Sequence, residues 1–377
     1  MPLKANAKLN GGITMAATAT KFGAQMIDGY TYISRLRIFS LTLKKLSSYL
    51  YFHLTLLMNR ILFLILIFVG LITGCQKIPS DCVQCNDPAA KNYNSNATSD
   101  TTCCIYGKIK PAVKTKLDDE VQETSGLVFA NGRLWTHNDS GGKPALYAVD
   151  SSNGKILQTV VLDGATNVDW EDMTRSSTHL YVGDMGNNTG NRKNLRIYRF
   201  PLQLLDSTKD TIHVISETIS FSYADQTDFT PREEHNFDCE ALIYSQDHLY
   251  LFTKNRQDNR CNIYMLPAVT GTYQAEKQTS FHSRGLVTGA SISATGKEIV
   301  LVGYTKSLSV FAWILSGYTG NQFLSADRKL FRLGDFSGAG QMEAVSYIDN
   351  NTLFFSSEKV LTVPARLYRL PTNLFRE

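Results

Sequence analysis

The sequence predicts an all-β fold: a β-propeller of five four-stranded blades closed by its N-terminal strand, with six blades as the alternative. Three observations predict it. Tyr (18) and Phe (19) are abundant and glycine outnumbers proline, a strand pattern recurs along residues 108–377, and the chain ends one strand short of a complete blade. Aromatic-rich strands joined by tight turns are typical of such folds. An apolar content of 43% allows a full core, so we expect a globular protein.

Each repeat has a lead residue, an apolar pair, a turn and a second strand that contains Leu-Tyr or an equivalent pair. The spacing of the lead residues fits one four-stranded blade per repeat. A longer interval before the third lead residue leaves room for a sixth blade. The lead residues are Ser125, Glu171, Glu240, Ala290 and Glu343.

The ends of the predicted propeller complement one another. A third strand follows each strand pair, and the chain stops soon after Leu370, so the last blade lacks an outer strand. Residues 108–121 precede the first blade and are predicted to supply that strand. Pairing the two ends closes the ring and removes exposed sheet edges.

Residues 58–74 have the parts of a secretory signal: a basic start, a short apolar run and small residues before Cys75. The end of this segment resembles the lipobox of bacterial lipoproteins, which implies that Cys75 is acylated and becomes the N-terminus. Residues 1–57 are then expected to be an over-extended start, with translation from Met58. The alternative is a cytoplasmic tail and a longer membrane segment that begins near Leu54.

Residues 75–107 are expected to be a cysteine-rich spacer that links the lipid on a membrane to the propeller at 108–377. This organisation implies a location in the cell envelope, at the outer membrane or cell surface. Clustered cysteines in an exported protein suggest disulfides more than a zinc site. The spacer also resembles short cysteine-closed modules of exported Bacteroidetes proteins, some of which look like calcium-binding repeats; a plain linker is the alternative. The clustered cysteines are Cys82, Cys85, Cys103 and Cys104.

The lead residues are expected to converge, because the first strand of each propeller blade lines the central channel. Carboxylates that share a site raise one another's pKa. A hard cation such as Ca²⁺, bound by carboxylates, hydroxyls and water, removes this conflict. The alternative is that the glutamates bind no metal and are either solvated or paired with Lys or Arg side chains. The predicted calcium ligands are Ser125, Glu171, Glu240, Ser291 and Glu343, with the Gly289–Ala290 backbone as the alternative to Ser291 in the fourth blade.

This pattern of one serine and three glutamates resembles the central calcium shell of the five-bladed calcium-activated nucleotidases, the animal apyrases. The spacing of the repeats resembles that family over residues 120–355, but few residues are identical. The resemblance implies a calcium-centred propeller and places Asp139 where that family has the second Asp of an Asp-Asp-Arg-Thr-Gly run. Ser140 and Gly141 stand in place of the Arg-Thr, so a phosphate-binding arginine is missing there.

Polar loops follow the second strands and predict a ligand-binding face. Their Gly, Asn and Asp content is explained equally well by turn chemistry. Their basic side chains favour an anionic small molecule or a glycan as the ligand. The residues of this face are Asn138, Asp184, Asn187, Asn188, Arg192, Lys254, Arg256 and Lys359.

Two functions follow from these patterns. The first is a calcium-dependent hydrolase of phosphoesters or phosphoanhydrides, with His137 and Asp139 as the acid/base pair and Asp139 or Glu171 orienting water. The second is a non-catalytic surface propeller with structural calcium that binds a glycan, peptide or protein. A calcium ion with an open coordination position and an Arg or Lys within reach would favour the enzyme over the non-catalytic propeller. The net charge of +4 is concentrated before residue 61 and predicts no nucleic-acid partner; we expect a monomer.

Overall fold

The computed structural model describes residues 5–8, 14–17, 85–96, 104–206, 208–325 and 327–376. The chain divides into two compact units, Met1–Gly74 and Cys75–Glu377. In the first unit, β1 (Ala5–Lys8) pairs antiparallel with β2 (Thr14–Ala17). None of the helices that the structure describes is long and apolar enough to cross a membrane. The predicted signal at 58–74 and the predicted lipidation site Cys75 lie outside the described residues, as do Cys82 and Cys103.

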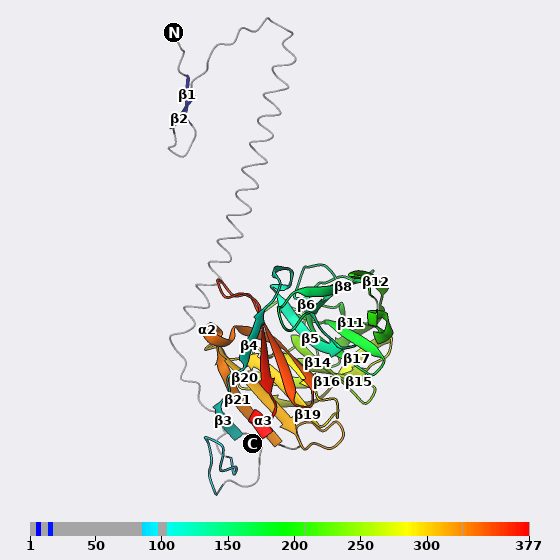
Figure 1. The fold of residues 1–377 in the computed structure, drawn as a ribbon, viewed down its shortest axis with the longest axis vertical. Coiled ribbons are helices and arrows are strands. Elements are labelled where there is room, and N and C mark those ends of the chain that lie inside the picture. Colours follow the sequence, from blue (N-terminus) through cyan, green and yellow to red (C-terminus); the bar gives the residue numbers. More distant parts are fainter. Residues whose placement is uncertain are drawn as a thin grey trace, which may run out of the picture. The chain divides into compact units, whose positions relative to one another are not determined.

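The second unit is an all-β propeller, as the sequence predicts (Figure 1). Its described strands include five antiparallel four-stranded groups, which we number blade 1 to blade 5. Blade 1 consists of β5 (Thr124–Ala130), β6 (Arg133–Asn138), β7 (Ala145–Val149) and β8 (Ile156–Asp163). Blade 2 consists of β9 (Trp170–Arg175), β10 (His179–Asp184), β11 (Leu195–Pro201) and β13 (Glu217–Tyr223).

The remaining blades have the same antiparallel order. Blade 3 consists of β14 (Cys239–Ser245), β15 (His248–Thr253), β16 (Arg260–Pro267) and β17 (Gly271–His282). Blade 4 consists of β18 (Leu286–Ile292), β19 (Glu298–Tyr304), β20 (Ser309–Ser316) and β21 (Asp327–Asp335). Blade 5 consists of β22 (Gln341–Asp349), β23 (Thr352–Glu358), β24 (Arg366–Pro371) and β4 (Ala112–Lys116).

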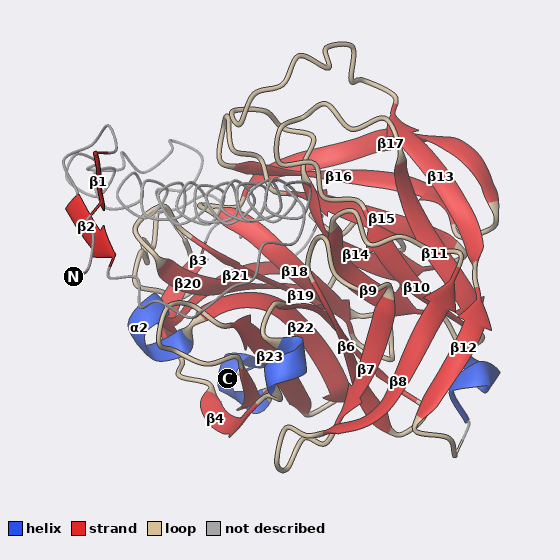
Figure 2. Cartoon of the chain, turned by 90° about the horizontal axis from the view of Figure 1, so that it is seen from above, coloured by secondary structure: helices blue, strands red, loops and turns tan. Residues whose placement is uncertain are grey.

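The first strands form a closed inner ring. Neighbouring first strands contact one another from β5 through β9, β14, β18 and β22 and back to β5. In Figure 2, the strands β14, β15, β16 and β17 of blade 3 follow one another outward from the middle of the body. Residues at equivalent positions of the first strands therefore face a common axis.

The last blade is completed from the N-terminal side, as predicted. β4 pairs antiparallel with β24, so residues 112–116 supply the outer strand that the chain end lacks. Leu117 and Val121, which follow β4, are buried in one cluster with Leu367 of β24. This pairing gives β24 a partner on its outer side and packs both chain segments together.

The longer interval before Glu240 contains an added edge strand. β12 (Thr211–Ile215) pairs parallel with β8 and extends blade 1. Blades 2 and 3 are joined along their outer strands by the parallel pair β13 and β17. In the described residues this interval therefore holds no sixth four-stranded group. The short helices are η3 (Asp119–Val121), η4 (Leu202–Asp206), α2 (Phe336–Ala339) and α3 (Asn373–Arg376).

The cysteine-rich spacer docks on blade 4. Cys85 and Cys104 form a disulfide, and β3 (Cys104–Lys108) pairs parallel with β21. The Tyr106 ring stacks on Phe331, with ring centroids 4.9 Å apart. The end of the spacer is thus part of a propeller sheet. Cys239 and Cys261 are buried and not disulfide-bonded.

Each first strand carries a one-residue β-bulge near its start. A bulge interrupts the alternation of side chains and re-aims one of them. In blade 4 the bulged residue is Thr288, which directly precedes the predicted Gly289–Ala290 alternative and lies three residues before Ser291. Sequence spacing does not reveal the extra residue. The bulges lie at Ser125–Gly126, Glu171–Asp172, Glu240, Thr288 and Glu343.

Candidate metal centre

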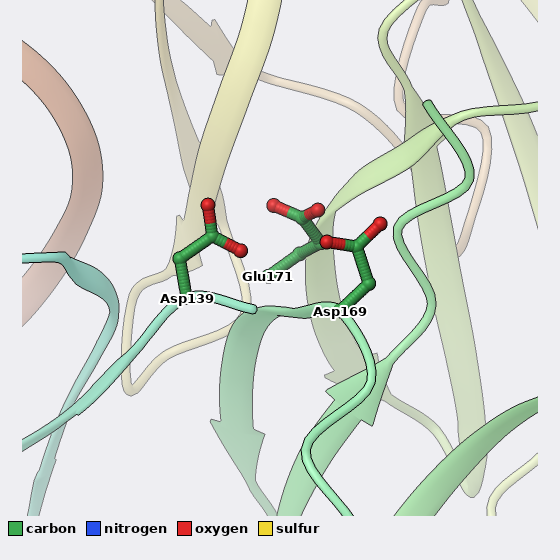
Figure 3. A group of neighbouring side chains, drawn as sticks. All are labelled: Asp139, Asp169 and Glu171. Carbon is green, nitrogen blue, oxygen red and sulfur yellow. The ribbon is translucent and has the colours of Figure 1, made fainter. Parts of the chain in front are cut away.

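Three carboxylates gather where the first strands begin. Asp139 directly follows β6, and Asp169 and Glu171 flank Trp170 at the start of β9. Each carboxylate contributes an oxygen, and these oxygens all lie within 4.8 Å of one another. Figure 3 shows the three side chains gathered around a common space. Asp139 is partly exposed, whereas Asp169 and Glu171 are buried.

Backbone hydrogen bonds fix the segments that carry these carboxylates. The N–H of Asp139 donates to the Glu123 carbonyl at 2.8 Å. The N–H groups of Met185 and Gly186 both donate to the Asp169 carbonyl at 3.1 Å. A methyl group at Gly186 would lie 2.0 Å from Glu171 Oε1 and 2.5 Å from Asp169 Oδ2. Only glycine lets the backbone pass this close to the two carboxylates.

Glu171 is a buried carboxylate without a counter-charge. Its exposed fraction is 4%, and no hydrogen bond or ion pair from a described residue reaches its carboxylate. Burial and the charges of Glu240 and Asp139 raise its pKa well above the usual range. Burial and the charge of Asp169 likewise raise the pKa of Asp139 to about 7. Ionised groups are rarely buried unless they are paired or bind a metal.

Blade 3 shows the same carboxylate position with its charge neutralised. Glu240 is the bulged residue of β14. Its carboxylate forms an ion pair with the Lys254 ammonium at 2.9 Å, and both side chains are almost fully buried. Asp238, two residues earlier, pairs with Arg256 at 2.9 Å. The Asp-x-Glu pair of blade 3 is therefore balanced within the chain, whereas the equivalent pair of blade 2, Asp169 and Glu171, is not.

A hydrogen-bonded link joins the two Asp-x-Glu pairs. The Asn188 amide donates to Asp169 Oδ2 at 3.3 Å, and its Oδ1 accepts from the Arg256 guanidinium at 2.6 Å. Burial and the charge of Asp238 raise the pKa of Asp169 to about 6. Arg256 keeps 26% of its side chain exposed, so it borders the carboxylate cluster at the surface.

Glu343 lies near the cluster but outside it. Its Oε1 accepts from the Gln341 amide at 2.5 Å, and burial raises its pKa to about 8. Burial and the charge of Asp139 raise the pKa of the neighbouring Glu358 to about 7. Both are therefore within electrostatic range of the cluster, while Glu240 and Glu343 do not join the three oxygens within 4.8 Å.

Of the predicted calcium ligands, the structure brings only Glu171 into the carboxylate cluster. The Ser125 hydroxyl donates to the Glu171 carbonyl at 2.6 Å. Thr288 makes the equivalent bond to the Met342 carbonyl at 2.9 Å. Ser291 lies at the opposite end of the first strands, where its Oγ accepts from the Tyr347 N–H. Among the described residues, Glu240 and Glu343 do not join Glu171 in the group of oxygens within 4.8 Å, and the calcium site with all five ligands stays a prediction.

His137 and Asp139 do not form the predicted acid/base pair. The His137 ring is fully buried, its Nδ1 bonds the Asn138 carbonyl at 3.0 Å, and its Nε2 has no hydrogen-bond partner among the described residues. The ring fits against Gly126 and meets Trp170 edge-on. Burial lowers the pKa of His137 to about 4. A side chain at Gly126 would collide with the ring, since its first carbon would lie 2.4 Å from His137 Nε2.

Most residues of the predicted ligand face hold loops or neutralise acids. Arg192 pairs with the buried Asp184 at 2.8 Å, and the Asn187 N–H donates to Asp238 at 2.7 Å. The remaining pairs are Asn138 with the Glu120 carbonyl and Lys359 with Gln122. Arg192, Lys254 and Arg256 are therefore counter-charges for acidic side chains, which leaves a cluster that attracts cations.

The sequence prediction missed Asp169, Asp238, Gly186 and Glu358. A signal for the first two was present: Asp169 stands two residues before Glu171, and Asp238 two residues before Glu240. The chemistry of the cluster fits a hard divalent cation, since its donors are carboxylate oxygens. Calcium takes six to eight oxygen ligands, so three carboxylates leave positions for water or an oxygen-bearing ligand.

Comparisons with known proteins find only distant structural similarity. No protein-family model matches the chain, and no curated protein does. Among solved structures, an exo-β-1,3-galactanase from Phanerochaete chrysosporium matches with a TM-score of 0.45 and 9% identity, covering 71% of this chain and 65% of that one. An aldose sugar dehydrogenase from Streptomyces coelicolor matches with a TM-score of 0.40 and 11% identity, covering 69% of this chain and 97% of that one.

A gluconolactonase from Xanthomonas campestris is a third such structure, with a TM-score of 0.37 and 12% identity, covering 68% of this chain and 88% of that one. At these identities and TM-scores, the similarity says nothing about what this chain binds or which reaction it performs.

Proposed function

We propose that the propeller binds a calcium ion through Asp139, Asp169 and Glu171 and uses it to hold an oxygen-bearing, anionic ligand. The observation that carries this proposal is the uncompensated carboxylate of Glu171, which is 4% exposed. Its equivalent in blade 3, Glu240, has Lys254 as a built-in counter-charge. A bound cation supplies the charge that blade 2 lacks.

The donor set and its exposure favour calcium with an open side. The three carboxylates supply hard oxygen ligands, and His137 and the buried Cys239 take no part in the cluster. Asp139 is the least buried of the three, so the cluster is accessible from its side. Calcium tolerates irregular geometry and mixed protein and solvent ligands better than Mg²⁺ does.

Isothermal titration of the mature protein with CaCl₂ tests this proposal. We expect one calcium ion per chain for the wild type and for Glu276→Gln, which makes the same chemical change on an exposed strand. Glu171→Gln should remove binding. Equal affinity in wild type and Glu171→Gln would refute the site.

A second candidate function is hydrolysis of a phosphoester or phosphoanhydride. Arg256 favours it, because this partly exposed cation is linked to Asp169 through Asn188. In such a reaction Arg256 would bind phosphoryl oxygens and Asp139 would orient water, while bound calcium supplies Lewis acidity. The resemblance to calcium-activated nucleotidases points the same way. A panel of nucleotides and phosphoesters, with Arg256→Gln as the variant, decides it: calcium-dependent release of phosphate that falls in the variant supports hydrolysis.

The place of action that we propose is the cell envelope, with the protein anchored by lipid on Cys75. The sequence at 58–75 supports this, and the disulfide between Cys85 and Cys104 is consistent with export. Intact-mass measurement of the membrane fraction should give a chain that begins at an acylated Cys75. Cys75→Ser should leave the unprocessed precursor.

A further inference from the structure

A cavity of about 570 Å³ lies at the end of the inner ring opposite the carboxylates. It is bordered by the last residues of β9, β14, β18 and β22 and by the end of β5, whereas the carboxylates lie where these strands begin. Its volume is in the range of small-ligand cavities. All five first strands contribute, so the walls are part of the rigid ring.

The hydroxyl groups in this wall are held in position. Thr174 Oγ1 accepts from the Tyr244 N–H at 3.2 Å, and Ser291 Oγ accepts from the Tyr347 N–H at 3.1 Å. Each bond links neighbouring first strands. Among the described residues, neither hydroxyl donates a hydrogen bond, so both keep a proton for a ligand. Thr174 is buried, which increases the cost of leaving its donor unused.

The cavity has no net charge. Its charged lining residues are Arg175 and Asp349, one of each sign. Arg175 already donates to the Phe129 carbonyl at 2.8 Å, and Asp349 accepts from the Asn351 N–H at 2.7 Å. The two formal charges cancel, so the lining gives no net attraction to an anion or to a cation, in contrast to the carboxylate end of the same ring.

Aromatic rings complete the wall. Phe129 and Tyr244 are half-buried, and both line the cavity. The Tyr244 ring is stacked on Tyr181, with centroids 5.7 Å apart, and its hydroxyl donates to Asp247 at 2.8 Å, so this ring is fixed. A rigid aromatic face beside hydroxyl donors suits a ligand that has both apolar C–H faces and hydroxyl groups.

We propose that this cavity is a second binding site and that it takes a neutral saccharide. The combination of fixed hydroxyl donors, an aromatic face and zero net charge matches a sugar ring and matches neither an anion nor a cation. This site is separate from the carboxylate cluster, so saccharide binding does not depend on calcium.

Saturation-transfer NMR on the mature protein tests this proposal with glucose, galactose and N-acetylglucosamine as neutral probes and glucuronate as the charged control. At least one neutral sugar should bind saturably, more tightly than glucuronate and equally in calcium and in EDTA. Thr174→Val should weaken binding by about tenfold or more, because it removes one donor from the wall. Thr174→Ser keeps the hydroxyl and should bind like the wild type.

Ser291→Ala provides an independent variant and should also weaken binding of the sugar that binds best. Circular dichroism and the melting temperature establish that each variant is folded. The proposal is overturned if no neutral sugar binds at concentrations up to about 10 mM. It is also overturned if folded Thr174→Val and Ser291→Ala both bind as the wild type does, or if glucuronate binds most tightly.

Discussion

The ammonium group of Lys254 lies 2.9 Å from the Glu240 carboxylate, and both side chains are almost completely buried. Burial by itself lowers the pKa of Lys254, but the charge of Glu240 outweighs it and the pKa is raised. Glu171 occupies the equivalent bulge of the preceding blade without such a partner. The two blades thus balance the same carboxylate in different ways.

Removing the internal counter-charge of blade 3 should destabilise the fold. Lys254→Met leaves Glu240 as a buried carboxylate without its closest cation, which costs about 3–5 kcal/mol of unfolding free energy. The double variant Lys254→Met/Glu240→Gln should regain most of this loss, because no charge remains to be compensated. Urea unfolding at neutral pH measures both, and a loss below 1 kcal/mol in the single variant would show that the pair is not structurally important.

The stability of the calcium-free protein should fall as pH rises. The pKa values of Asp139 and Asp169 are raised to about 7 and about 6, above their values in an unfolded chain, which are near 4. The folded chain therefore binds more protons between about pH 4 and 7, and its unfolding free energy decreases with pH in that window. The stability that these two protonated carboxyl groups contribute is fully present below pH 4 and is lost above pH 7.

Urea unfolding in EDTA from pH 4.5 to 8 measures this trend. Saturating calcium should reverse it, because the ion favours the ionised carboxylates and competes with protons. Calcium affinity should accordingly increase from pH 5 to pH 8. An unfolding free energy in EDTA that does not change with pH would mean that these carboxylates have ordinary pKa values. Their charges would then be compensated by solvent or by other groups of the protein.

Gly186 should be required for calcium binding but not for folding. Alanine there would place a methyl group 2.0 Å from Glu171 Oε1, which forces that side chain to move. We expect calcium affinity to drop by about tenfold or more, equivalent to about 1.4 kcal/mol. Gly142→Ala is the matched control, since its added methyl meets nothing nearer than 3.9 Å. Titration calorimetry compares the two, and unchanged affinity in Gly186→Ala would remove Glu171 from the ligand set.

The repeat pattern predicted the propeller, a closing strand within 108–121 and the equivalence of Glu171, Glu240 and Glu343, because these follow from periodicity and strand pairing. The fourth repeat was misaligned, since Thr288 stands at the bulge where the other repeats have a serine or a glutamate, and spacing alone does not mark the bulged residue. A bulge is a property of two paired strands, and one strand's sequence does not determine it.

The charges of the site were harder to predict than its position. Arg192, Lys254 and Arg256 suggested an anion-binding face, but each is paired with an acidic side chain that precedes it at the same end of its own blade. Such pairing depends on strand register and loop conformation. The repeated Asp-x-Glu at 169–171 and 238–240 was visible in the sequence, and only the structure shows that one copy is neutralised and the other is not.

The most direct test of the account is the thermal unfolding of wild type and Glu171→Gln at pH 8, each in EDTA and in calcium at about 100 times its Kd. For the wild type, calcium should add about 2.7 kcal/mol of stability, which corresponds to roughly 5–10 °C in melting temperature. Glu171→Gln should melt above the wild type in EDTA, since it removes a buried uncompensated charge, and should not respond to calcium. A wild type that melts at the same temperature in calcium and in EDTA would contradict the metal centre.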